Sequence, residues 1–498
     1  MLQPDPTGES KPLPRRWRRR WYLVGIFTLL ALGLAAAYFM LSIAAQRDLE
    51  AALAETDRTD PGWRLQELEA KRLAIADEQN SAINLVNARA MLPMPWPSFS
   101  KPASWTADDL AEFWQGIDSP EPPALLDAPR ATALRAELKK AEKTLVELYK
   151  IADKPHGRFP IAYSKDSIST SLDHSQGVRR LVDLLGDDAL LRAQDGDIEG
   201  AMKACRCMLH AGRAIGDEPT VISVLIRWAI HNVTLKRIER VLAQGELSES
   251  SLAALQHLLE EDVAEPTLLQ GARGNRAMDD GCLAAMQSGA VKFSWKNLVG
   301  FTRRSNRSSQ QDALLEVRFM LAPRSVLADR AALLRFNNQF VEFAKLPVEE
   351  IHAKLQELNL DTRNLPSVAW QMAIDNWDRQ ILRYLRSQAS LRCGIVMLAA
   401  ERYRRAHQHW PQGMDDLVPA YLSRAPADPF DGQPLRIRSF ADGIVVYSVG
   451  DDSRDRAGNL SNAGNLRDDA QRPTSNWGFR LFDVRKRRQP PGKPSPRQ

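Results

Sequence analysis

A short acidic segment near the C-terminus holds the side chains best suited to bind a metal ion. Clustered carboxylate and amide oxygens on one loop are what a hard cation such as Ca²⁺ requires. The alternative is a solvated turn, where Asp and Asn are favoured because their side chains bond to the nearby backbone. Arg454 and Arg456 lie among the carboxylates and would weaken a cation site. The residues of this candidate calcium loop are Asp451, Asp452, Asp455 and Asn459.

The histidines are weaker candidates for chemistry. Glu349 and His352 form one E-x-x-H motif, but a di-metal bundle needs two such motifs and further carboxylates, so a structural role is favoured. His407 and His409 close a predicted helix, where the helix dipole favours capping over a metal site. His231 lies on an apolar helix and is predicted to be a satisfied core histidine. The chain has no H-E-x-x-H, G-x-S-x-G, Walker, G-x-G-x-x-G or C-x-x-C motif, and no catalytic residue is predicted.

Four cysteines in 498 residues do not form a disulfide framework. Cys205 and Cys207 are two residues apart on a predicted helix, so they point in different directions and cannot easily pair. Cys282 and Cys393 stand alone. All four are predicted to be buried small hydrophobes, with one long-range bridge left open as an alternative.

Residues 21–45 contain no charged side chain, and a helix of these 25 residues is long enough to cross a bilayer. Five arginines between Arg15 and Arg20 precede this run. By the positive-inside rule, the N-terminus is expected in the cytoplasm and the bulk of the chain outside the cytoplasmic membrane. The alternative is a cleaved signal peptide, for which Ser42-Ile43-Ala44 offers a site, but the apolar run exceeds the usual length. The sequence therefore predicts an uncleaved signal-anchor.

Charge is concentrated at the two ends of the chain. The overall charge is +5, but residues 1–20 carry +4 and residues 485–498 carry +6, which leaves −5 on the remainder. Both terminal blocks are rich in proline and are predicted to be disordered. No basic face is implied, so nucleic acid is not an expected partner. An apolar share of 44% with 26% charged residues is typical of a globular body.

The middle of the chain predicts helical hairpins. A helix ending at Asp195-Gly196 is followed by one over 198–215, which Asp197 can cap. Further helices are predicted over 221–242 and 252–263, with Ser248 as the cap of the second. Trp228 lies in the apolar first half of the 221–242 helix and is expected to be buried.

After Trp410 the composition changes to short strands and turns. Residues 435–440 and 443–449 read as strands. Asp442-Gly443 between them is a strong turn signal, so a hairpin is predicted.

Several segments of this region resemble the C-terminal half of the major pseudopilin of type II secretion. They are residues 400–405, Trp410-Pro411, residues 415–417, residues 428–432 and residues 447–451. The resemblance implies a helix, a proline-bounded connection, a small antiparallel sheet and a calcium loop. In that family the membrane helix continues directly into this domain, whereas about 340 residues intervene here.

The whole chain also resembles a group of uncharacterised membrane-anchored proteins of planctomycete type. Residues 57–65, 193–197 and 428–434 carry this similarity. The resemblance implies no known activity.

These patterns predict a mostly α protein: a transmembrane helix, an extracytoplasmic helical-hairpin body and a small pseudopilin-like α+β region. The expected role is interaction or scaffolding in the cell envelope, with membrane as the one expected partner. The alternatives are an extracytoplasmic hydrolase whose site is not visible as a motif, and a component of a type II secretion-like apparatus. The predicted divisions are a basic cytoplasmic tail (1–20), a transmembrane helix (21–45), a helical stalk with a proline-rich connection (46–130), an α-helical body (131–385), the α+β region (386–484) and a basic disordered tail (485–498).

Overall fold

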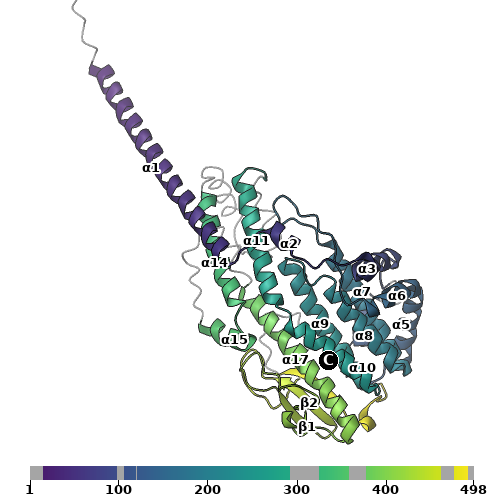
Figure 1. Ribbon diagram of the computed structural model, residues 1–498. Helices are drawn as coiled ribbons and strands as arrows, with labels where there is room; N and C mark the ends of the chain where they lie inside the picture. Colours follow the sequence, from purple (N-terminus) through teal and green to yellow (C-terminus); the bar gives the residue numbers. More distant parts are fainter. Residues whose placement is uncertain are drawn as a thin grey trace, which may run out of the picture.

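The computed structural model describes residues 15–97, 106–118, 121–291, 325–357, 377–460 and 476–491. It is mostly helical, with a small three-stranded antiparallel sheet near the C-terminus, as the sequence predicts (Figure 1). Residues 302–312, whose polar composition predicts a connecting segment, lie outside these ranges.

The first helix, α1 (Arg15–Thr59), projects away from the rest of the molecule (Figure 1). Its large apolar side chains are exposed on every side; Phe27 is 75% exposed and Leu34 71%. Within the described part of the chain, this is the one helix long and apolar enough to cross a membrane. The sequence prediction of such a helix is confirmed.

The far end of α1 packs against α14 (Ser325–Phe343) in the body. Leu49 and Ala52 are buried there beside Ala331 and Leu334. The predicted helical stalk and proline-rich connection span residues 46–130, and within that range the structure places α1's last turns, α2 (Leu65–Ala70) and α3 (Ser81–Met91) in contact with body helices. The physical reason is that each of these segments has an apolar side to bury, which a solvated stalk would leave exposed.

The body is an array of packed helices joined mainly by short loops (Figure 1). Asp197 and Ser248 cap α8 and α10 through backbone N–H groups of Gly200 and Ser251, as predicted. Apolar residues at spacings of three and four predict one helix from about residue 131 to 151, but the structure divides it near Ala141 into α5 and α6. The helices are α4 (Ala107–Asp118), α5 (Ala128–Lys140), α6 (Glu142–Tyr149), α7 (Asp173–Asp195), α8 (Ile198–Arg213), α9 (Val221–Leu242), α10 (Glu249–Ala264), α11 (Thr267–Gln287), α15 (Val348–Glu357) and α17 (Trp377–His407).

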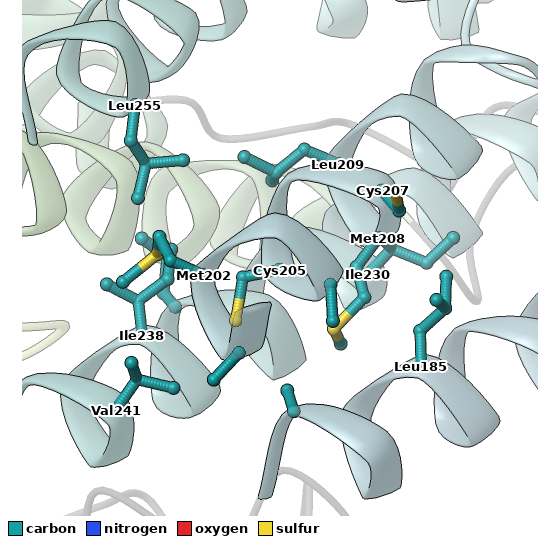
Figure 2. Close-up of a cluster of buried hydrophobic side chains, with 14 of the residues drawn as sticks. Leu185, Met202, Cys205, Cys207, Met208, Leu209, Ile230, Ile238, Val241 and Leu255 are labelled. Atoms are coloured by element: carbon teal, nitrogen blue, oxygen red, sulfur yellow. The ribbon is translucent and has the colours of Figure 1, made fainter. Parts of the chain in front are cut away.

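A continuous apolar core joins α7, α8, α9, α10 and α17. Figure 2 shows the part of it that α7, α8, α9 and α10 contribute. All four cysteines are free and buried, which confirms their prediction as small hydrophobes. Burial raises the pKa of the Cys205 and Cys207 thiols to about 12, so neither is a reactive thiolate at neutral pH. Trp228 is 4% exposed, and its indole N–H donates to Thr267 Oγ1 at 3.0 Å. Its predicted burial is confirmed.

The sheet has the order β1-β2-β3 and is antiparallel throughout. The predicted hairpin is confirmed by β1 (Arg436–Phe440) and β2 (Gly443–Ser448), with Phe440 opposite Gly443. Gly443 has φ +149°, and an added Cβ would meet the Leu481 carbonyl oxygen at 1.9 Å, so glycine is required there. The third strand, β3 (Trp477–Phe482), is absent from the sequence prediction.

The sheet does not stand apart from the helices. α17 contacts β2 and β3, and α9 contacts β3. Val446 and Phe479 on the sheet belong to the same apolar core as Leu391 and Val396 of α17. Helix α17 therefore crosses the predicted division at 385/386 and links the body to the sheet.

The segment after β3 is ordered as far as residue 491, which differs from the predicted disordered tail over 485–498. Arg487 is 6% exposed and donates to both carboxylate oxygens of Glu401, at 3.1 and 2.9 Å. Gln489 forms a parallel bridge with Ala124. The basic composition predicts a solvated tail. The contacts of Arg487 with the buried Glu401 carboxylate and of Gln489 with the backbone of Ala124, both distant in sequence, order the segment instead. Residues 492–498 lie outside the described ranges.

Candidate functional site

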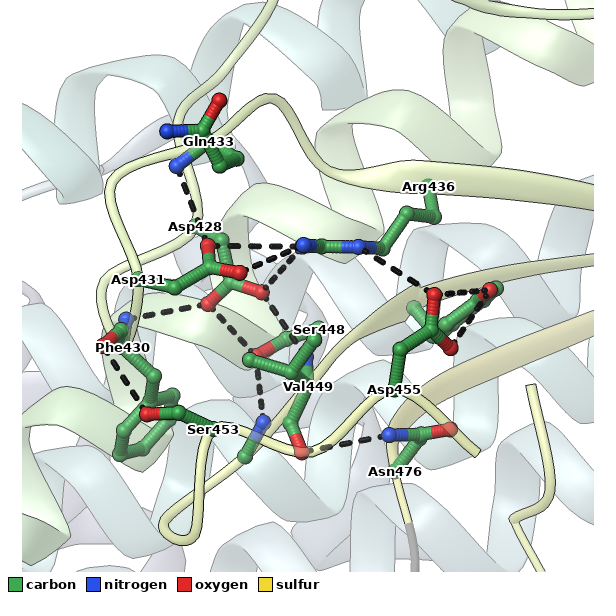
Figure 3. Close-up of polar contacts among 12 residues, drawn as sticks. Asp428, Phe430, Asp431, Gln433, Arg436, Ser448, Val449, Ser453, Asp455 and Asn476 are labelled. Atoms are coloured by element: carbon green, nitrogen blue, oxygen red, sulfur yellow. Dashed lines mark hydrogen bonds and ion pairs between the residues drawn. The ribbon is translucent and has the colours of Figure 1, made fainter. Parts of the chain in front are cut away.

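The candidate calcium loop follows β2, and each of its carboxylates contacts a different arginine. Asp451 accepts from Arg386 of α17, with Nε 3.1 Å from each oxygen. Asp452 pairs with Arg456. Asp455 accepts from Tyr447 Oη at 3.1 Å and lies 3.8 Å from Arg436 Nε (Figure 3). The backbone carbonyl of Asn459 accepts from the Asn476 N–H at 2.8 Å.

The carboxylate oxygens of Asp451, Asp452 and Asp455 therefore contact three different arginines. In the described part of the chain, no group of three or more His, Cys, Asp or Glu residues could hold a metal ion. Calcium binding by Asp451, Asp452, Asp455 and Asn459 stays a prediction. The interleaved Arg456, expected to weaken a cation site, does form an ion pair within the loop.

We expect the melting temperature of the full chain to be the same in Ca²⁺ as in EDTA, because a cation would have to displace arginines already paired with the loop. A ligand that binds only the folded state would raise the melting temperature. A higher value in Ca²⁺ that Asp452→Asn abolishes, and that Asp153→Asn at an exposed site retains, would contradict this expectation and establish the loop as a calcium site.

Asp428 organises the turn before β1 and was not predicted as a site residue. It is completely buried and accepts hydrogen bonds from Ser448 Oγ and the Val449 N–H, both at 2.8 Å, and from Arg436 Nη1 at 3.0 Å (Figure 3). Burial raises the pKa of Asp428, although these donors oppose the shift. Its contacts join residues 426–434 to the end of β2, which is a structural role.

The E-x-x-H residues do not form a metal pair. His352 is buried and its Nδ1 lies 2.9 Å from the Phe430 carbonyl oxygen, whereas Glu349 faces Arg392 of α17. The structural role favoured from the sequence agrees with these contacts. His231 is buried, as predicted, and its Nε2 lies 3.5 Å from Asp262 Oδ2 on α10.

A cleft of about 530 Å³ opens between α10, α15, α17 and the segment 422–427. Four charged side chains line it: Glu260, Glu349, Arg392 and Arg424. Sequence reasoning missed this site because its residues come from four separate segments and form no motif.

Arg392 and Glu349 form the central ion pair of this cleft. Arg392 Nη1 donates to Glu349 Oε1 and to the Ala427 carbonyl oxygen, each at 2.6 Å. Although burial raises the pKa of Glu349, its own backbone N–H and the charges of Arg392 and Arg424 bring it below the ordinary value. Glu349 is therefore charged at neutral pH, and the cleft is polar on this side.

Two further buried carboxylates lie in opposite electrostatic surroundings. Asp262 on α10 accepts from Arg213 Nε at 2.9 Å and Arg227 Nη2 at 2.8 Å, and its second oxygen lies 3.5 Å from His231 Nε2. Burial alone would raise the pKa of Asp262, but these charges hold it well below the usual range.

Asp279 on α11 forms no ion pair with a lysine, arginine or histidine in the described ranges. Its Oδ2 accepts from the amides of Asn275 and Asn337 at 2.8 and 2.9 Å. Burial raises the pKa of Asp279 to about 7, which the two amide donors only partly oppose and the nearby Asp280 reinforces. It is the more easily protonated of the two buried aspartates.

No protein-family model, curated protein or solved structure matches this chain.

Proposed function

We propose that this chain is a single-pass membrane protein of the cell envelope whose extracytoplasmic body acts by binding partners rather than by catalysis. The observation that carries the proposal is that α1 combines an exposed apolar first part with last turns that are packed in the body. Its apolar first part is exposed on all sides, which is unfavourable in water and favourable in lipid. Its last turns are buried in the body.

The connection between anchor and body supports a scaffold role. α1 runs without a break from Arg15 to Thr59, so no flexible linker separates the apolar part from the packed part. Arg335 Nη2 lies 2.8 Å from Asp48 Oδ1, and Asn338 donates to Thr56 Oγ1 at 2.8 Å. Just beyond the helix, Asp60 is held by Arg273 and Arg276. Such a connection would keep the body at a fixed height and orientation above a bilayer.

Cysteine labelling in intact cells tests this topology with little background, because all four native cysteines are buried. We expect Arg180→Cys, at an exposed site on α7, to react with a membrane-impermeant maleimide added outside spheroplasts. Ser10→Cys, in the basic N-terminal block, should react only after permeabilisation. The reverse pattern would overturn the orientation, and release of the protein from washed membranes without detergent would overturn the anchor.

A further inference from the structure

The cleft between α10, α15 and α17 contains a buried guanidinium with unused hydrogen-bond donors. We propose that this cleft binds a small ligand bearing a carboxylate next to an apolar group. The inference goes beyond the membrane-anchored role and does not depend on the anchor, because every residue of the cleft lies well beyond α1 in the chain.

Arg392 supplies the first argument. A guanidinium has five N–H donors, and the two hydrogen bonds that Arg392 makes to described residues both use Nη1. No described residue accepts from its Nε or Nη2, although the side chain is only 11% exposed. These donors face the cleft, where an entering acceptor could bind them in place of water.

Arg424 supplies a second positive charge at the same cleft. It is exposed, and no described carboxylate lies within ion-pair distance of it, although its charge reaches Glu349. Two arginines that share a cleft favour a planar oxyanion, which a guanidinium binds through two parallel hydrogen bonds. Glu260 and Glu349 also line the cleft, and their negative charges disfavour a dianion such as phosphate. A singly charged carboxylate fits this balance better.

The apolar side chains of the cleft indicate which group would accompany the carboxylate of the ligand. Val263, Ile395, Leu422 and Pro426 present apolar surface to the same space. The volume, about 530 Å³, lies in the range of small-molecule sites. Burial of an apolar group against these side chains would add the hydrophobic contribution that the carboxylate alone lacks.

The probe for this site is N-acetyl-L-leucine, which has one carboxylate and one branched apolar side chain. We expect it to raise the melting temperature of the detergent-solubilised full chain by about 1–3 °C at ten times its dissociation constant. N-acetyl-L-leucinamide, the neutral analogue, and inorganic phosphate should give no shift. The same measurement with a short peptide ending in leucine tells whether the ligand is a peptide C-terminus or a small free acid. A chain end is indicated if the peptide with a free C-terminus raises the melting temperature and its amidated form does not.

In Arg424→Gln, at least ten times more N-acetyl-L-leucine should be needed for the same rise in melting temperature. The melting temperature of the free variant should equal that of the wild type, because Arg424 makes no hydrogen bond or ion pair to a described residue. Arg180→Gln, an exposed arginine on α7, removes the same charge elsewhere and should keep the full response. No shift with N-acetyl-L-leucine up to about 10 mM, the range of weak ligands, would overturn the proposal. An equal shift with the amide, or one retained in Arg424→Gln, would do the same.

Discussion

Replacing Asp262 with alanine is expected to lower the free energy of unfolding by about 3–5 kcal/mol. The change removes the carboxylate that both Arg213 and Arg227 contact, and these side chains are only 3% and 2% exposed. Two guanidinium groups would then share the interior with His231 and no fully buried counter-charge. Chemical denaturation of the full chain in detergent measures the loss.

Glu261→Ala is the matched control for this prediction. Glu261 also contacts Arg213, at 2.9 Å, but its side chain is 49% exposed. A partly solvated ion pair contributes only about 0–1 kcal/mol. If both variants lose the same small amount, the Asp262 cluster does not carry the expected stabilisation.

Asp279→Asn is expected to make the protein more stable than the wild type at alkaline pH and to flatten its stability profile. The pKa of Asp279 is about 7 in the folded chain, against 3.8 for the free group. A raised folded-state pKa contributes stability that is complete below the unfolded pKa and is lost as the pH rises through the folded one. The wild type should therefore lose about 2–3 kcal/mol from this group between about pH 5 and pH 8.

Asparagine keeps an oxygen for the amides of Asn275 and Asn337 and carries no charge to desolvate. Thermal melts of both proteins across this pH range measure the difference. Asp153→Asn, at a side chain 92% exposed, should retain the wild-type profile. Glu239, whose pKa burial also raises to about 7, stays in the Asp279→Asn variant and will leave part of the slope. An unchanged slope in Asp279→Asn would contradict the assignment of this proton to Asp279.

Local patterns were sufficient for much of the helical array. The bounds predicted for α9, 221–242, are those of the structure, and the caps Asp197 and Ser248 bond where expected. These features depend on residues three or four positions apart, so the sequence contains the whole interaction. The uncharged run over 21–45 is equally local, since helix length and side-chain polarity decide whether a segment suits a bilayer.

The strand β3 shows where a local signal exists but is not enough. Trp477, Phe479 and Leu481 alternate along it and are buried, a pattern that the sequence displays. A six-residue strand has no stability by itself, because its hydrogen bonds go to another strand. Here that strand is β2, and residues 449–476 separate the two in the sequence. The same holds for the ordered segment after β3, whose Arg487 is held by Glu401, 86 residues away.

By itself, the sequence determined several helices of the array, the caps Asp197 and Ser248, the β1–β2 hairpin and the apolar length of α1. Only the tertiary structure decided which charged side chains meet: Asp262 with Arg213 and Arg227, and Arg392 with Glu349. The types of these residues are visible in the sequence, but their pKa values and unused donors depend on burial and on partners from other helices. Because the energy of a charge changes steeply with its solvation and with the few ångströms to its neighbours, packing determines which of many charged residues form a site.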